Sequence, residues 1–278
     1  MIPGKQLSVA LTGKVRMVQC SVIVPTYKEA GNLESLTRRL FKAFKEFRGG
    51  ALGDIELIFV DDNSRDGSQQ HVERLAAQGL NCRIIVRTVE RGLSSAVLRG
   101  FAEARGEYLI CMDADLQHPP EKAPELAQAL VEGAEFVLGT RYGSQDSIDK
   151  DWPLHRRVIS TGARLLALPL SSLNDPMSGF FGIPRHVLQR AVANKVSPIG
   201  FKIALEIFVK ARVDHSRVVH VPISFGVRTV GESKLSSKVI LSYLSHLVEL
   251  YHFTFPALIP VLVVLILTLL VLLVVKLW

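Results

Sequence analysis

The chain has 278 residues, 48% of them hydrophobic, and a formal net charge of +7. That length suits one large α/β domain or two smaller ones, and the basic balance fits nucleic acid, an anionic membrane surface or anionic substrates. No nucleic-acid-binding motif is visible, so we expect no nucleic-acid partner. Three scattered cysteines, Cys20, Cys82 and Cys111, lack the spacing of metal ligands and predict reduced thiols in the core.

Residues 1–17 are expected to form a loose tail, because their apolar run is too short for a secretory signal. The next segment, 18–234, alternates short apolar runs with stretches of helical periodicity. The expected strands are Gln19–Val24, Ile55–Val60, Arg83–Arg87, 108–112 and Phe136–Gly139, and the expected helices are Glu29–Phe47, Asp66–Ala77, Leu93–Ala104 and one beginning near Pro120. This alternation predicts an α/β domain with a mainly parallel sheet and helices on both faces.

The C-terminal part of the chain is apolar. Ala257–Val275 contains no charged residue, and at about 1.5 Å per residue it can just cross a hydrocarbon core of roughly 30 Å. We therefore expect one membrane-spanning helix within 256–278. The preceding segment, 235–255, mixes charged and apolar residues and predicts an amphipathic helix at the membrane interface. A helix packed on the domain is the alternative.

Polar clusters follow three of the expected strands: Pro25–Glu29, Asp61–Ser64 and Asp113–Asp115. The carboxyl ends of parallel strands share one edge of a sheet, so these clusters should converge there. In extended chain, side chains at i and i+2 point the same way, so Asp113, Asp115 and Gln117 are expected to project together. Such oxygen ligands favour a hard cation, Mg²⁺ or Mn²⁺, although a solvated turn is an alternative.

The turn after the first strand lacks the Gly-x-Gly-x-x-Gly pattern of dinucleotide-binding domains. The chain instead resembles the family 2 glycosyltransferases of the GT-A (Rossmann-like) fold, and among them the dolichyl-phosphate mannosyltransferases in their single-subunit form with a C-terminal anchor. The segments that carry this resemblance are Val22–Glu29, Val60–Ser64, Asp113–Pro120, Gly139–Tyr142, Asp175–Phe180 and Arg228–Leu235.

The resemblance implies an inverting, metal-dependent enzyme that transfers mannose from GDP-mannose to dolichyl phosphate and releases GDP. Its product would supply mannose for N-glycan, O-mannosyl and GPI-anchor synthesis. The resemblance also implies a single-pass protein of the endoplasmic reticulum membrane, with a cytosolic catalytic domain and a luminal C-terminus. Membrane lipid would be a partner, and no obligatory protein subunit is expected.

The resemblance assigns roles to individual residues. The expected catalytic residues are Asp113, Asp115, Arg228 and Lys234. The expected nucleotide-sugar contacts are Pro25, Tyr27, Glu29, Asp61, Asp62, Asp113, Ala114, Arg228 and Lys234. The expected acceptor-phosphate contacts are Arg141, Arg156 and Ser160, and the expected metal ligands are Asp113, Asp115 and Gln117.

Some of these residues have a second interpretation. Either Asp61 or Asp62 would also suit a cap on the turn that follows the strand. Lys202 and Glu206 are four residues apart, so they form either an ion pair on a helix or part of the site. Asp175 suits a positioning role better than a chemical one.

A phosphate acceptor simplifies the expected chemistry. A phosphate monoester has a second pKa near 6, so at pH 7 it is already a nucleophilic anion and needs no dedicated base. Two other functions remain open: a dolichyl- or polyprenyl-phosphate glucosyltransferase that uses UDP-glucose, and a non-catalytic lipid- or sugar-nucleotide-binding subunit. The intact acids and cations argue against the second, whereas residue chemistry does not distinguish mannose from glucose.

Overall fold

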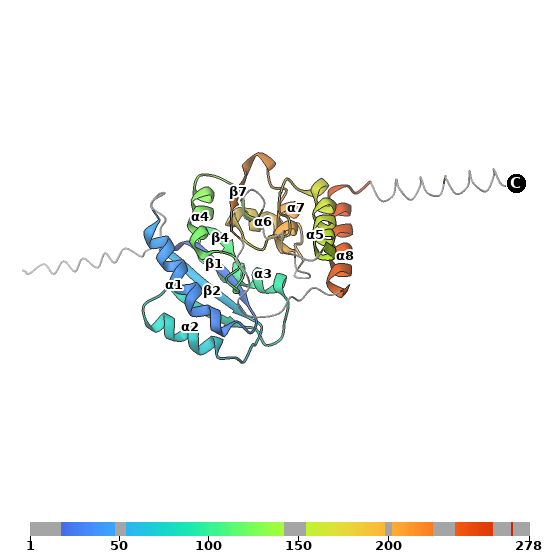
Figure 1. Ribbon diagram of the computed structural model, residues 1–278. Helices are drawn as coiled ribbons and strands as arrows, with labels where there is room; N and C mark the ends of the chain where they lie inside the picture. The colour runs from blue at the N-terminus through green and yellow to red at the C-terminus, as the bar shows by residue number, and fades with distance from the viewer. Residues whose placement is uncertain are drawn as a thin grey trace, which may run out of the picture.

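The computed structural model describes residues 18–47, 54–141, 154–197, 202–224 and 237–257, together with Thr268; for 18, 154–160 and 237–240 it describes the backbone alone. Its centre is a seven-stranded sheet in the order β3-β2-β1-β4-β6-β5-β7 (Figure 1). The strands are β1 (Val18–Thr26), β2 (Asp54–Asp61), β3 (Cys82–Val86), β4 (Tyr108–Cys111), β5 (Phe136–Thr140), β6 (Phe181–Pro184) and β7 (Val218–Pro222).

Helices connect most of these strands. The α-helices are α1 (Ala30–Glu46), α2 (Ser68–Ala77), α3 (Leu93–Glu103), α4 (Ala123–Val131), α5 (Leu154–Ala167), α6 (Arg185–Ala193), α7 (Ile203–Lys210) and α8 (Ser237–Thr254). The short 3-10 helices are η1 (Pro120–Lys122), η3 (Leu168–Leu170) and η4 (His215–Arg217). The α/β class and all the strands and helices expected up to position 140 are confirmed, with ends that differ by a few residues.

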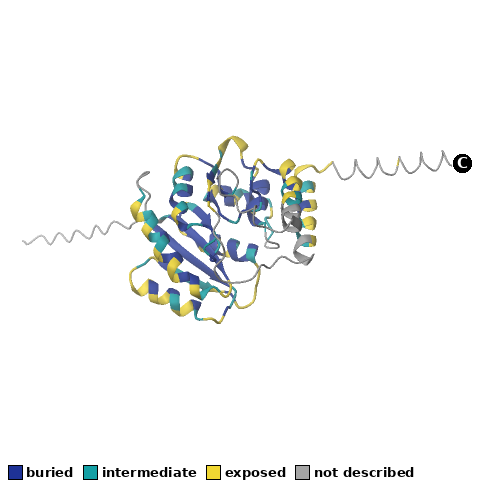
Figure 2. Ribbon diagram, viewed as in Figure 1, coloured by how far each residue is buried: buried dark blue, intermediate teal, exposed yellow. Residues whose placement is uncertain are grey.

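The two faces of the sheet bury alternate residues of each strand, as β geometry requires. Ile23 of β1 and Ile58 of β2 belong to a core with α3, α6, α7 and α8, whereas their neighbours Val22 and Leu57 pack with α1, α2 and α4. Burial on both faces explains why these strands read as continuous apolar runs. Figure 2 shows the sheet as the buried centre between the helices. The three cysteines are buried in it as free thiols.

One strand differs from the expected parallel arrangement. The pairings β1–β2, β1–β4, β2–β3 and β5–β7 are parallel, whereas β6 pairs antiparallel with both β4 and β5. Phe181, the first residue of β6, lies opposite Cys111 of β4 and Leu138 of β5. The amino end of β6 therefore lies at the edge where the other strands have their carboxyl ends. The segment 175–180, which leads into β6, is brought to that edge.

Buried charges join α7 to α8, which lies beside α5 in Figure 1. The Lys210 ammonium donates to the Lys195 carbonyl at 2.9 Å and lies 2.8 Å from both Glu206 and Glu249. His246 Nε2 lies 3.1 Å from Glu206 Oε2. Burial alone would raise the pKa of Glu206, but His246 and Lys210 outweigh it and hold that pKa below its usual value. The helix expected over 235–255 is therefore present and contacts the domain.

The helices within the described ranges are all too short or too polar to cross a membrane. The expected span, 256–278, lies outside the described residues except for the short stretch at its start and Thr268. The expected tail, 1–17, also lies outside them.

Two helical glycines should respond oppositely to substitution by alanine. A Cβ at Gly100 of α3 would lie 3.0 Å from Val60 Cγ2 and closer still to Ile23 Cγ2, both on stiff β-branched side chains. Gly100→Ala should therefore lower the free energy of unfolding by about 1–3 kcal/mol. A Cβ at Gly162 of α5 would meet no atom within 4 Å, so Gly162→Ala should raise it by about 0.5–1 kcal/mol. Urea unfolding measures both, and a neutral Gly100→Ala would contradict the packing described here.

Candidate active site

The loops that follow β1, β2 and β4 line one edge of the sheet and share an unusual backbone feature. Each contains non-glycine residues in the left-handed region: Lys28 (φ 61°) after β1, Asn63 (57°) and Arg65 (54°) after β2, and Leu116 (62°) after β4. Such conformations cost about 1–3 kcal/mol each and persist where the surroundings hold them. Their gathering at one edge marks it as the candidate site.

The acids after β4 lie beyond the end of the strand, where the chain enters a turn. β4 ends at Cys111, and residues 114–115 form a turn. The expectation that Asp113, Asp115 and Gln117 project together because side chains alternate was therefore wrong in its geometry. The turn itself draws the segment together: Asp115 Oδ1 accepts from the Gln117 N–H at 3.1 Å, and the Asp113 N–H donates to His118 Nδ1 at 3.1 Å.

The two acids differ in exposure. Asp113 keeps 39% of its side chain exposed, whereas Asp115 is buried. Among the described residues, none donates a hydrogen bond to the Asp113 carboxylate, although His118 Nδ1 lies 3.6 Å from it. A Cβ at Gly179 would lie 3.3 and 3.4 Å from the two Asp113 oxygens, so glycine at that position leaves space beside the carboxylate.

These residues fit a divalent metal that takes its remaining ligands from substrate. Within the described ranges, no group of three or more His, Cys, Asp or Glu side chains is placed to hold a metal ion. Mg²⁺ in particular is often held by one or two carboxylates together with substrate phosphates and water. Asp113, Asp115 and the amide oxygen of Gln117 offer oxygen donors of that kind, and metal binding by them stays a prediction.

The β1 and β2 side of the edge carries the residues expected to hold the nucleoside. Pro25 pairs with Val60 within the sheet, and the Tyr27 ring is exposed. Lys28 Nζ lies 5.5 Å from the centre of that ring. Glu29 accepts from the Asn32 amide at 2.7 Å.

Asp61 and Asp62 are both held by neighbouring groups. Asp61 accepts from the Ser64 N–H at 2.8 Å and from the Ser64 hydroxyl, so it is the acid that caps the turn. Asp62 accepts from Arg87 and, at 2.8 Å, from the Gly92 N–H. Arg87 is buried and also donates to Ser95 at 2.8 Å. Sequence reasoning missed Arg87, since its partner lies 25 residues away. Nucleoside binding by Asp61 and Asp62 stays a prediction.

The far side of the edge is built around the segment 175–180. Arg141 follows β5, and its Nε and Nη2 each donate to the Asp175 carboxylate at 2.8 Å. Asp175 is 1% exposed and Arg141 15%. The Ser178 hydroxyl donates to the Gly139 carbonyl at 2.6 Å, and the Phe180 ring stacks on His118 at 5.3 Å. The segment therefore contacts both β5 and the turn that holds Asp113.

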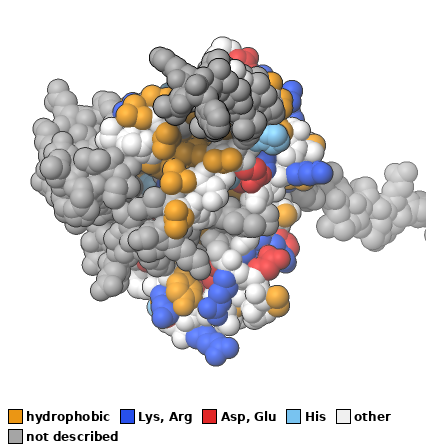
Figure 3. Space-filling model, turned by 90° about the vertical axis from the view of Figure 1, so that its right-hand side faces the viewer, with side chains coloured by type: hydrophobic (Ala, Val, Ile, Leu, Met, Phe, Trp, Pro, Cys, Tyr) orange, Lys and Arg blue, Asp and Glu red, His pale blue; other side chains and the backbone are white. Residues whose placement is uncertain are grey.

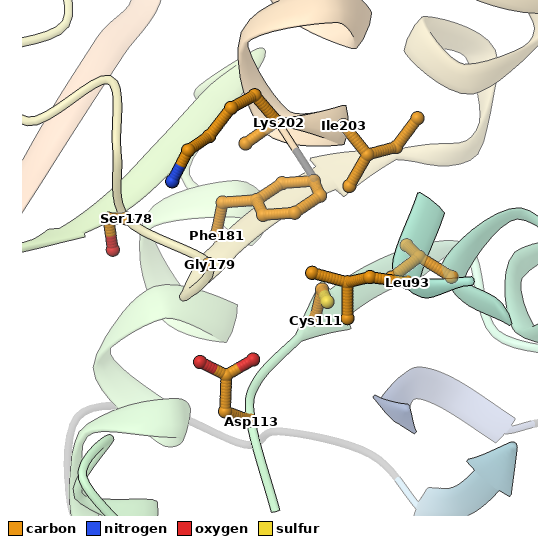
Figure 4. A pocket seen from close by; sticks show the side chains of 10 residues that line it. Leu93, Cys111, Asp113, Ser178, Gly179, Phe181, Lys202 and Ile203 are labelled. Carbon is orange, nitrogen blue, oxygen red and sulfur yellow. The ribbon is translucent and has the colours of Figure 1, made fainter. Parts of the chain in front are cut away.

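Lys202 belongs to this site and not to a helix ion pair. Its Nζ donates to the Met177 carbonyl at 3.2 Å, while Glu206 pairs with Lys210 instead. Lys202 and Asp113 line one small pocket with Ser178, Gly179 and apolar side chains of α3 and α7, and Figure 4 shows the Asp113 carboxylate directed into it. The pKa of Lys202 is lowered, first by burial and then by Arg141, although Asp113 and Asp175 oppose this.

Several expected site residues cannot be compared with the structure. Arg228 and Lys234 lie outside the described residues. Arg156 and Ser160 lie one turn apart on α5, as expected, but their side chains are not described. His118, to which sequence analysis assigned no role, is buried between Asp113 and Phe180.

The lysines at the two ends of α7 should differ in their effect on stability. Lys210 satisfies three acceptors, two of them carboxylates, whereas the described residues offer Lys202 one carbonyl. Lys210→Met should cost on the order of 3 kcal/mol, because it leaves buried Glu206 without its lysine partner. Lys202→Met should stay within about 1 kcal/mol of wild type. Chemical unfolding compares them, and an equal loss in both variants would refute the contrast.

Comparison with known proteins identifies the family. The family model described as Glycosyl transferase family 2 matches residues 21–191, more than half of the chain. A protein named dolichol-phosphate mannosyltransferase from Mycosarcoma maydis is 57% identical over 246 residues, which cover 88% of this chain and 83% of that protein. A protein of the same name from Saccharomyces cerevisiae is 55% identical over 243 residues, covering 86% and 90%.

A solved structure shares the fold. The mannosyltransferase PcManGT from Pyrobaculum calidifontis, in complex with GDP-Man and Mn²⁺, aligns with a TM-score of 0.52 at 21% identity. The alignment covers 74% of this chain and 55% of that one, so this chain spans little more than half of that structure. The identity of the relatives and the extent of the family match agree: the chain belongs to glycosyl transferase family 2.

Proposed function

We infer that this protein is a dolichol-phosphate mannosyltransferase, the name that its relatives from M. maydis and S. cerevisiae share. It transfers mannose to dolichyl phosphate. The observation that carries this function is that a partly exposed acid, Asp113 after β4, and a cation, Arg141 after β5, lie at the same edge of the sheet. Both substrates are anions. In this proposal the donor diphosphate is bound through a metal, and the acceptor phosphate is bound through cationic side chains.

The donor in this proposal is GDP-mannose. Tyr27 offers the nucleoside a flat exposed surface, and the acids after β1 and β2 offer acceptors for base or ribose N–H and O–H groups. Asp113 and Asp115, with Gln117, would hold Mg²⁺ or Mn²⁺. When bound, that metal stabilises negative charge on the departing diphosphate. Arg228 and Lys234 are proposed to act on the same diphosphate.

The acceptor phosphate attacks without a general base. Its oxygen forms a bond to C1 of the mannose as the bond from C1 to the donor phosphate breaks, and GDP leaves with the electron pair. In-line attack inverts the anomeric centre. The chain's main task is to offset the repulsion between the two anions. Arg141 lies at the correct edge for this, with Arg156 and Ser160 of α5 as the other proposed contacts.

The proposed location is the endoplasmic reticulum membrane, with the domain on the cytosolic side and 256–278 as the anchor. The apolar side chains of α8 support contact with a membrane surface, since Leu247 and Leu250 pack inward while Leu241, Leu244 and Val248 are exposed. Tyr251 of α8 donates to the Leu166 carbonyl at 2.9 Å, which holds α8 beside α5. Figure 3 shows hydrophobic side chains gathered on this side of the molecule. Such a surface suits an interfacial helix.

The test of function is transfer by the purified full chain. GDP-mannose and UDP-glucose are each offered with dolichyl phosphate and Mg²⁺ or Mn²⁺, and the lipid product is analysed. We expect mannosyl lipid from GDP-mannose. Transfer from UDP-glucose but not from GDP-mannose would show that the enzyme is a glucosyltransferase. Binding of both substrates without turnover would indicate a non-catalytic subunit.

Asp113→Asn should lower turnover on the order of a hundredfold or more, because the metal loses a charged ligand. The fold should survive, since the described residues make no hydrogen bond to that carboxylate. Turnover and thermal unfolding are measured together. Wild-type turnover at full rate in EDTA would contradict metal dependence.

Substituting aspartate for exposed apolar residues of α8 tests whether this helix contacts the membrane. In a chain that lacks the proposed anchor 256–278, Leu241→Asp with Val248→Asp should reduce flotation with phospholipid vesicles, because two exposed apolar contacts are lost. Val89→Asp is the control, since Val89 is 92% exposed and lies in the loop between β3 and α3. Equal flotation of the α8 variant and the control would show that this side of α8 does not bind lipid.

A further inference from the structure

The Asp175 carboxylate occupies an unusual place in the site. It is 1% exposed, and Arg141 is its ion-pair partner, with Nε and Nη2 both at 2.8 Å. A guanidinium is planar, so two parallel hydrogen bonds fix both its position and the direction of its other N–H groups. Asp175 therefore determines the orientation of the Arg141 guanidinium.

The same carboxylate also balances charge. Arg141 and Lys202 lie close enough for Arg141 to lower the pKa of Lys202, while Asp175 acts in the opposite direction. Without an anion at this point, two cations would repel each other in a partly buried place. Asp175 therefore permits Arg141 to lie near Lys202, which lines the pocket together with Asp113.

Stability alone does not account for this pair. Replacing a buried ion pair by apolar side chains is often neutral or stabilising, so such a pair is weak support for a purely structural role. The position of Asp175 points to function instead. It begins the segment 175–180, whose Gly179 lies against the Asp113 carboxylate and whose Met177 carbonyl accepts from Lys202.

We propose that Asp175 is a positioning residue for the acceptor: it orients the Arg141 guanidinium toward the phosphate of the polyprenyl lipid. This rests on the proposed function, because it requires a phosphate acceptor. Asp175 itself touches neither substrate. Its removal should therefore weaken binding of the lipid phosphate and leave the nucleotide unaffected.

A second buried carboxylate that pairs with arginine lies near the other end of β5 and provides a control. Glu135 precedes β5, whereas Arg141 follows it. Glu135 is also buried and pairs with two arginines, with Arg190 at 2.6 and 3.2 Å and with Arg217 at 3.1 Å. Glu135→Gln therefore removes a comparable buried charge at the opposite end of β5.

The experiment measures binding by calorimetry with the full chain in detergent, using GDP and a short polyprenyl phosphate as separate probes. Asp175→Asn should raise the dissociation constant for polyprenyl phosphate about tenfold and leave that for GDP unchanged. Glu135→Gln should change neither, although it lowers the unfolding temperature. These readouts need no turnover, so a wild type that binds polyprenyl phosphate but transfers no mannose would refute the proposed function and leave the inference standing.

A second set of variants tests whether Asp175 affects polyprenyl phosphate binding through Arg141 or independently of it. Arg141→Ala combined with Asp175→Asn should bind polyprenyl phosphate no worse than Arg141→Ala alone, because Asp175 acts through Arg141. Guanidinium ion at millimolar concentration should partly restore binding to Arg141→Ala, since Asp175 can hold it, but not to the double variant.

Three results would overturn the inference. Asp175→Asn with unchanged affinity for polyprenyl phosphate would show that the pair is structural, whether or not the variant is less stable. Equal loss of GDP and polyprenyl phosphate affinity would show that Asp175 serves the whole site. Additive losses in the double variant, or guanidinium rescue without Asp175, would show that it does not act through Arg141.

Discussion

The site depends on the reversed direction of β6. Because β6 runs antiparallel between β4 and β5, its amino end lies at the edge where their carboxyl ends lie. The segment 175–180 therefore enters the sheet between Asp113 and Arg141. A parallel strand in this position would place its preceding segment at the opposite edge. The close approach also needs a glycine, since a Cβ at Gly179 would crowd the Asp113 carboxylate.

This segment also determines the electrostatics of the site. Its Asp175 pairs with Arg141, its Met177 carbonyl holds Lys202, and its Phe180 stacks on His118, the residue that accepts from the Asp113 backbone. Arg141, which follows β5, and Lys202, which precedes α7, are thus held near one another, and the Asp175 carboxylate that balances their charge is buried. In a partly desolvated pocket such charges act more strongly than at the surface. The same arrangement would attract an anionic group from outside.

Sequence analysis predicted the strands and helices, which periodicity and chain order reveal. It did not predict strand direction or side-chain partners that are distant in the sequence. The strands of the first half are buried on both faces, so their apolar runs and polar ends were visible. A four-residue strand such as β6 has no readable direction, because alternation is the same in both orientations. The i and i+2 argument for Asp113 and Asp115 failed because β4 ends at Cys111 and the chain turns, with Leu116 at φ 62°. Partners such as Arg87 with Asp62 or Asp175 with Arg141 lie 25 and 34 residues apart, beyond any local pattern.

Helix α7 connects the pocket to the helix that precedes the apolar C-terminal segment. Lys202 lines the pocket just before the amino end of α7. Lys210 at the carboxyl end pairs with Glu249 of α8, and Glu206 in the first turn pairs with His246 of α8. Eight residues of helix at about 1.5 Å each make a short and stiff connection. If α8 lies on the bilayer surface, the height of the pocket above that surface is fixed by this connection. A lipid phosphate has a defined depth in a membrane, whereas a soluble nucleotide sugar does not. A rigid connection between the pocket and α8 would therefore serve a lipid-bound acceptor more than a soluble donor.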